Sequence, residues 1–151
     1  MSLREKFTAD LKDAMKAGEK TKVAAIRLIT AALKDRDILA RGEGKTVSDE
    51  DILALLQKMI KSRQESLDIY EKNNRPELAA QEKGEIEVIT SYLPKQMDEA
   101  AVAEAIKAAI AETGAASIKD MGKVIGVLKG KYTGQMDFGK ASAAVKAALA
   151  G

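Results

Sequence analysis

Hydrophobic side chains recur every three or four residues along almost the whole chain, which is the spacing of one face of an α-helix. The first such stripe consists of Leu3, Phe7, Leu11 and Met15. Ser2 and Glu5 have the spacing of a capping box before this stripe, and Gly18 is a natural stop after it. No segment shows the alternation of a β-strand, so we predict an all-α fold.

Three further helices are predicted before a proline at position 94. The second helix runs from about Lys20 to about Arg41 and ends at the glycines of Gly42-Glu43-Gly44. Ser48 caps the third helix, which Asn73-Asn74 ends, and Pro76 suits the first turn of the fourth. The expected inward side chains are Ile26, Ile29 and Leu33; Ile52, Leu55, Leu56, Met59, Arg63, Leu67 and Tyr70; and Leu78, Ile86, Ile89 and Leu93.

Pro94 is expected to end the fourth helix, because proline cannot continue a helix and biases the residue before it towards extended geometry. Beyond it the composition shifts towards Ala and Gly. We therefore predict two domains. Residues 1–94 form about four helices, the third and fourth being a long hairpin, and residues 98–151 form a bundle of three helices.

The three helices of the second part have recognisable boundaries. Asp98 opens the first, Gly114 ends it, and Ser117 caps the second. A glycine-rich turn over residues 130–134 separates the second from the last. Their inward side chains are predicted to be Val102, Ile106 and Ile110; Met121, Val124, Ile125 and Leu128; and Phe138, Ala141, Val145 and Leu149.

Composition removes most of the usual catalytic groups. The chain of 151 residues contains no His, Cys or Trp, which excludes a cysteine nucleophile, an imidazole base, a Cys/His zinc site and a disulfide. The sequence also shows no catalytic triad of an amidase and no nucleotide-binding motif. We expect no catalytic residue, no metal and no cofactor. No apolar run approaches the length of a membrane span and no signal peptide is evident, so we expect a cytoplasmic location and no membrane partner.

Two longer segments carry a family resemblance. Residues 58–97 read KMIKSRQESLDIYEKNNRPELAAQEKGEIEVITSYLPKQM, and residues 114–145 read GAASIKDMGKVIGVLKGKYTGQMDFGKASAAV. The first resembles the middle, and the second the C-terminal half, of the YqeY-like family of small bacterial proteins. The pattern positions in the first segment are Ile60, Lys61, Arg63, Ser66, Tyr70, Arg75, Leu78, Glu82, Glu85, Ile86, Tyr92, Leu93, Pro94 and Gln96.

The C-terminal half is also similar to the tail domain of the B subunit of the glutamine-dependent aspartyl/glutamyl-tRNA amidotransferase. In that enzyme the tail is a helical appendage that contacts tRNA, while the chemistry lies elsewhere. The resemblance implies a free-standing relative of the tail and an inherited description as a carbon–nitrogen ligase with glutamine as amido-N-donor. The family commonly has Gly-Arg-Ala-Asp before the last helix, where this chain has Gly134-Gln135-Met136-Asp137 and so lacks a basic residue.

Lysines near the C-terminus are the best candidate site. From Ala115 onward there are six Lys and two Asp. The candidate nucleic-acid-binding residues are Lys119, Lys123, Lys129, Lys131, Lys140 and Lys146. Backbone N–H groups at the helix start near Ser117 offer a place for a phosphate. Such a surface would bind by charge; the alternative is an ordinary solvated lysine face.

Three other features have a functional and a structural interpretation. Gly122 and Gly126 favour close helix packing, or close approach by a partner's backbone. Residues 130–134 match only part of a phosphate-loop pattern, and a plain turn is favoured. Tyr132 could stack on a base, although it is the only aromatic residue in that turn.

The acidic residues are interpreted as structural. Arg63 and Glu82 fall in the apolar stripes of the third and fourth helices and are expected to pair, or to pack their stems with their charged ends in solvent. Catalysis by Glu82, Glu85 or Asp68 lacks identifiable partners. We therefore predict a noncatalytic, tRNA-associated helical module. The alternatives are a protein–protein adaptor that docks a partner on its long N-terminal helices, and an amidotransferase in its own right.

Overall fold

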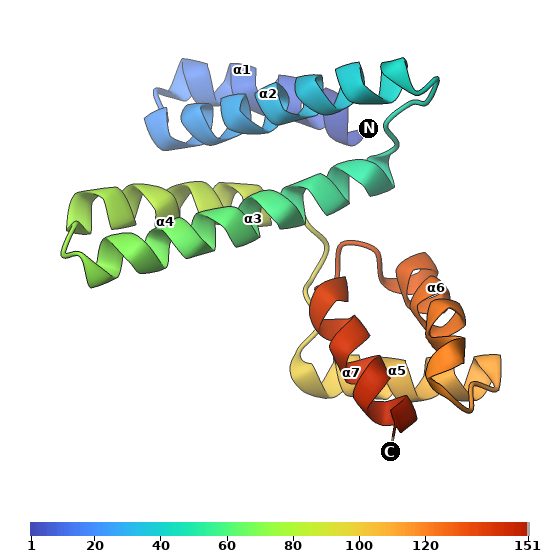
Figure 1. The fold of residues 1–151 in the computed structure, drawn as a ribbon. Helices are drawn as coiled ribbons and strands as arrows, with labels where there is room; N and C mark the ends of the chain where they lie inside the picture. Colours follow the sequence, from blue (N-terminus) through green and yellow to red (C-terminus); the bar gives the residue numbers. More distant parts are fainter. Residues whose placement is uncertain (151) are drawn as a thin grey trace. The chain divides into compact units, whose positions relative to one another are not determined.

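The computed structural model describes residues 1–150, which form seven α-helices and one short 3₁₀ helix with no β-strand among them (Figure 1). The predicted all-α fold is therefore confirmed. The helices belong to two compact units, one spanning Met1–Leu93 and the other beginning at Pro94. We call them the N-terminal unit and the C-terminal unit. Gly151, the last residue of the second predicted domain, lies outside the described residues.

The N-terminal unit consists of two helical hairpins that lie one against the other (Figure 1). The first contains α1 (Leu3–Ala17) and α2 (Lys20–Gly42), and the second contains α3 (Asp49–Lys72) and α4 (Pro76–Thr90). Within the second hairpin α3 packs along α4, and α2 packs on α4 to join the hairpins. The core between them contains Phe7, Ile26, Ile29, Leu33, Ile52, Leu56, Ile89 and Tyr92.

Local signals at the helix ends are as the sequence predicts. The hydroxyl of Ser2 accepts from the backbone N–H of Glu5, and Ser48 does the same for Asp51, so both helices begin with a capping box. Gly18 ends α1 with φ of 71°. Pro76 occupies the first turn of α4. These ends fix where each helix begins and therefore which side chains face the core.

Two predicted core side chains are exposed instead. Met15 is 54% exposed and Ala14 is buried in its place, because steps of four residues drift around a helix that has 3.6 residues per turn. Leu78 is 43% exposed, while the neighbouring Ala79 is buried. The tip of the α3–α4 hairpin extends past the turn between α1 and α2, so fewer helices surround Leu78 (Figure 1).

A charged cluster lies between α3 and α4. The guanidinium of Arg63 donates to Glu82 at 3.2 Å and also to Glu85, which is only 3% exposed. Gln81 donates to the other carboxylate oxygen of Glu85 at 3.3 Å. The predicted pair between Arg63 and Glu82 is confirmed. The deeper partner, Glu85, was not predicted for this role.

Tyr92 ties the turn after α4 back to α1. Its hydroxyl donates to a carboxylate oxygen of Asp10 at 2.7 Å, and its ring meets that of Phe7 edge to face with centroids 4.8 Å apart. Burial raises the pKa of this hydroxyl, and the hydrogen bond to Asp10 adds to the shift. The turn also corrects a prediction. α4 ends at Thr90, four residues before Pro94, and the N–H groups of Tyr92 and Leu93 bond back to Ile89 and Thr90.

The C-terminal unit contains three helices that pack on one another, α5 (Glu99–Thr113), α6 (Met121–Tyr132) and α7 (Phe138–Ala150), with the 3₁₀ helix η1 (Ile118–Asp120) before α6. Asp98 caps α5 and Gly114 ends it with φ of 67°, as predicted. The core of this unit contains Ala105, Ile106, Ala109, Val124, Leu128, Met136, Ala141 and Val145.

The region around α6 differs from its predicted boundaries. Ser117 begins the short η1 and not the α-helix, which starts at Met121. α6 then continues to Tyr132, so that Gly130 lies within the helix and the connection to α7 starts three residues later than predicted. The reason is that Leu128 and Tyr132 both pack into the core and keep the chain helical past the glycine.

The Arg63 cluster generates a stability prediction. Replacing Arg63 with Met leaves Glu85 buried without its charged partner, and we expect the free energy of unfolding to fall by about 3 kcal/mol. The double variant Arg63→Met/Glu85→Leu should recover most of that loss, because both charges at the deepest point are gone. Urea unfolding followed by circular dichroism measures both.

Lys61, exposed on the same helix, provides the control. Lys61→Met should change the free energy of unfolding by less than about 0.5 kcal/mol. If Arg63→Met is as mild as this control, the cluster does not hold the hairpin together.

Candidate nucleic-acid interface

All six predicted lysines are exposed in the C-terminal unit. Four of them lie close together in sequence, Lys119 in η1 and Lys123, Lys129 and Lys131 in α6, while Lys140 and Lys146 lie on α7. The structure thus places most of the candidate charge on η1 and α6. No carboxylate among residues 1–150 forms an ion pair with five of the six, the exception being Lys131.

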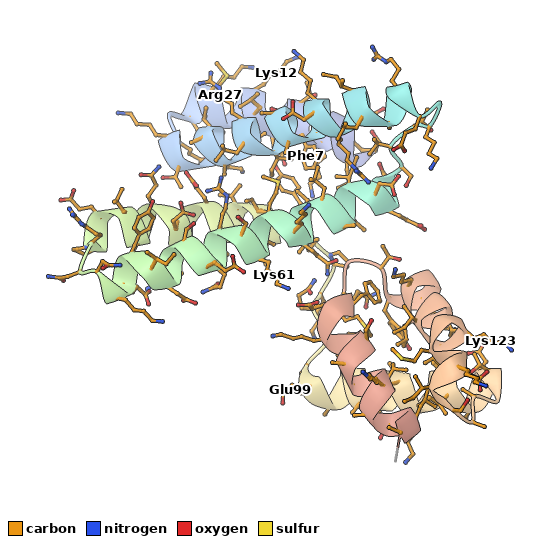
Figure 2. The ribbon with its side chains drawn as sticks, viewed as in Figure 1. Phe7, Lys12, Arg27, Lys61, Glu99 and Lys123 are labelled. Atoms are coloured by element: carbon orange, nitrogen blue, oxygen red, sulfur yellow. The ribbon has the colours of Figure 1, made fainter. Side chains whose placement is uncertain are left out.

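The exposed face of α6 is made of lysines and glycines. Val124 and Leu128 are fully buried, which sets the direction of the opposite, solvent-facing side of the helix. Lys123 and Lys129 are six residues apart and so project about 120° from each other around the helix axis. Figure 2 shows Lys123 on the side of α6 that faces away from α7. The arc between the two lysines holds Gly122, Gly126 and Gly130, and we call this surface the α6 glycine face.

The glycines of α6 are not packing residues, contrary to the prediction. A methyl group added at Gly122, Gly126 or Gly130 would meet no atom within 4 Å. The close helix contact occurs in the other unit, where a methyl group at Gly84 of α4 would lie 2.9 Å from the side-chain methyl of Thr21 in α2. The α6 glycine face is therefore an open strip of backbone with a lysine on either side.

Lys131 is engaged by a carboxylate. Its ammonium group donates to Glu112 of α5 at 2.7 Å, and this hydrogen bond raises the pKa of Lys131. Both side chains are about half exposed, so the pair adds little to stability. Lys129 and Lys131 also stand in the last turn of α6, where positive charge suits the helix dipole. Lys131 is consequently the weakest member of the predicted set.

A carboxylate occupies part of the predicted phosphate position at the start of the second helix. The carboxylate of Asp120 accepts from the backbone N–H groups of Ala116 at 3.0 Å and Ser117 at 3.4 Å. Those two bonds lower the pKa of Asp120, with the nearby Lys123 adding to the effect. These two backbone donors are thus already used, and a negative charge stands beside the predicted phosphate position.

Residues in and beside the connection from α6 to α7 pack against the core and form hydrogen bonds within the C-terminal unit. Tyr132 is half-buried against the core, so its ring is not a free platform for a base. Asp137 accepts from the N–H groups of Gly139 and Lys140 at the start of α7, a cap that was not predicted from the sequence. The backbone of Met97 donates to Gln135 at 2.9 Å, which ties the segment after Pro94 to this turn.

Among residues 1–150, the acidic side chains considered for catalysis lie on α3 (Asp68) and α4 (Glu82 and Glu85). Glu82 and Glu85 are both bonded to Arg63, and Asp68 is exposed. Within the same residues no three Asp or Glu side chains are grouped so that they could hold a metal ion. None of the helices described is both long and apolar enough to cross a membrane.

Comparison with known proteins identifies relatives of this chain. Residues 4–149 match the family model described as Yqey-like protein. A segment of 84 residues, 56% of this chain, is 33% identical to altered inheritance of mitochondria protein 41, mitochondrial, of Saccharomyces cerevisiae strain S288c. The protein of the same name from Lachancea thermotolerans is 36% identical over 84 residues. The matched segment spans 44% of each of these relatives, so this chain resembles less than half of their length.

Alanine substitutions at Gly126 and Gly84 test whether the space beside each glycine is open or filled. We expect Gly126→Ala to stabilise the protein by up to about 1 kcal/mol, because alanine favours the helix and the space beside it is open. Gly84→Ala should destabilise it, because Thr21 must shift to admit the new methyl group. Thermal unfolding of the two variants should give opposite shifts in Tm. A lower Tm for Gly126→Ala would show that this glycine has a packing role.

Proposed function

The chain belongs to the YqeY-like family, and from this premise we propose that it is a noncatalytic helical module whose C-terminal unit docks on tRNA. The observation that carries the proposal is the α6 glycine face with Lys123 and Lys129 at its edges. Neither lysine is paired with a carboxylate of residues 1–150, so each charge is available to an anionic ligand.

The open glycine strip suits the backbone of a nucleic acid. Without side chains between the two lysines, a sugar–phosphate chain can lie closer to α6, and the ammonium groups reach phosphates on either side of it. Such contacts recognise charge and shape and carry little sequence information. Lys119, Lys140 and Lys146 would extend the positive surface beyond α6.

The resemblance to the amidotransferase tail supports tRNA as the nucleic acid. The tail contacts tRNA without performing the reaction, and the groups described in this chain are likewise suited to binding. The names of the matched yeast relatives place those proteins in mitochondria and state no ligand. A cytoplasmic location for this chain stays a prediction.

Salt dependence tests the proposal directly. In filter binding of the full chain to total tRNA, raising the salt from about 50 to about 200 mM should weaken binding by about 40-fold if three phosphates are contacted. The double variant Lys123→Glu/Lys129→Glu should weaken binding at least about tenfold at the lower salt. Lys131→Glu alone should have a smaller effect, because Lys131 is already paired with Glu112.

A matched control separates the α6 face from general charge. Lys58→Glu/Lys61→Glu makes the same change in net charge on exposed positions of α3. It should leave tRNA binding within about twofold of the unmodified chain. Equal losses in the two double variants, or binding that ignores salt, would refute the C-terminal unit as the docking surface. Glutamine-dependent amide formation by the purified chain would instead support the amidotransferase alternative.

A protein–protein adaptor is the second candidate. One observation favours it. Ile38 and Leu39 near the end of α2 are 56% and 63% exposed. Large apolar side chains exposed next to one another are frequent at contact surfaces. The N-terminal unit would in that case recruit a partner protein, while the C-terminal unit binds RNA.

A further inference from the structure

The two hairpins of the N-terminal unit carry opposite charge. Residues 1–45, which include α1 and α2, contain 11 basic and 7 acidic side chains, whereas residues 46–94 contain 6 basic and 10 acidic. The ion pairs found in this unit lie within one hairpin or the other, such as Arg4 with Asp37 and Arg63 with Glu82. The surplus positive charge of the first hairpin is therefore left for its outer surface.

A line of basic side chains runs the length of α2. Lys20, Arg27, Lys34 and Arg41 recur at every seventh residue, and all four are exposed. Seven residues are nearly two helical turns, so the four lie on one side of α2 and span about 32 Å. Figure 2 shows Arg27 on the side of the first hairpin that faces away from α3 and α4. Among residues 1–150, no carboxylate forms an ion pair with Lys20, Arg27 or Lys34.

Beside this basic line the seam between α1 and α2 is hollowed, and the hollow near the turn between the two helices is mainly apolar. One hollow, of about 380 Å³, is lined by Ala14, Met15, Gly18, Lys20, Val23, Ala24 and Arg27. Its apolar lining consists mostly of small side chains, with the half-exposed Met15 contributed by α1 and the two cations by α2. A smaller hollow further along the seam, of about 220 Å³, includes Lys34 together with the paired Arg4 and Asp37. We call this surface the α1–α2 groove.

We propose that the α1–α2 groove binds an acidic amphipathic helix of a partner protein. Its apolar side chains would enter the hollow beside Met15, and its carboxylates would face Lys20, Arg27 and Lys34. The cations repeat about every 10.5 Å, the rise of seven helical residues, so a helix lying along α2 can present a carboxylate to each. A phosphate backbone would satisfy the cations but would leave the apolar lining unused, which is why a peptide is favoured.

The inference rests on the adaptor candidate, and it is independent of tRNA binding because it uses the other unit. A suitable probe is a synthetic helical peptide of about 21 residues with Glu at every seventh position and Leu on the adjoining face. A scrambled peptide of the same composition, in which Glu and Leu share no face, serves as its control. Fluorescence anisotropy with the full chain measures the affinity of each.

The expected result is saturable binding of the amphipathic peptide and at least about tenfold weaker binding of the scrambled one. Lys20→Glu/Arg27→Glu should weaken the amphipathic peptide at least about tenfold. The charge-matched Lys58→Glu/Lys61→Glu should not weaken it. Met15→Ser should weaken it by about threefold or more, because the edge of the hollow loses its apolar group.

Three outcomes would overturn the inference. In the first, the amphipathic peptide shows no saturable binding. In the second, both peptides bind equally well. In the third, Lys20→Glu/Arg27→Glu loses tRNA binding while its peptide binding is unchanged. The last would reassign the groove to RNA. Lys123→Glu/Lys129→Glu should retain full peptide affinity, so failure of the tRNA proposal and failure of this one are seen in different variants. Circular dichroism of each variant establishes that the helices are intact.

Discussion

The bonds of one guanidinium to two carboxylates set the register on which the N-terminal unit depends. Arg63 of α3 holds Glu82 and Glu85 of α4, which are three residues apart, so the two helices cannot slide without breaking one of these bonds. α4 in turn is the surface on which α2 packs, with Gly84 against Thr21. The α1–α2 hairpin, with its basic line and groove, thus packs on a helix that this contact helps to hold against α3.

Local chemistry is what the sequence predicts well. The capping box at Ser2, the cap at Ser48, the glycine end at Gly18 and the proline start at Pro76 depend only on neighbouring residues, and each is found in the structure. The buried positions follow from helical spacing wherever a helix is covered along its length. Met15 and Leu78 escape the pattern because burial at a helix end depends on how far the neighbouring helices extend. That information is not in the spacing.

The candidate surfaces were harder to predict, for two physical reasons. A glycine within a helix is compatible with close packing or with open space, and only the tertiary structure separates Gly84 from Gly126. Charge summed over residues 1–94 is zero and hides the division between the two hairpins. Sequence position alone singles out the six lysines, whereas the pairing of Lys131 with Glu112 depends on how α6 packs on α5. The division into domains of residues 1–94 and 98–151 stays a prediction.

The glycine content of α6 also has a consequence for local opening. Three of its twelve residues are glycines without packing partners, so the helix is maintained mainly by Val124, Leu128 and the other side chains that it buries. The free energy of local opening should therefore be lower for α6 than for α5 or α7, and its amide hydrogens should exchange faster with solvent deuterium. An anion bound along this face would slow that exchange, making protection of α6 a direct report of occupancy that needs no label on the ligand.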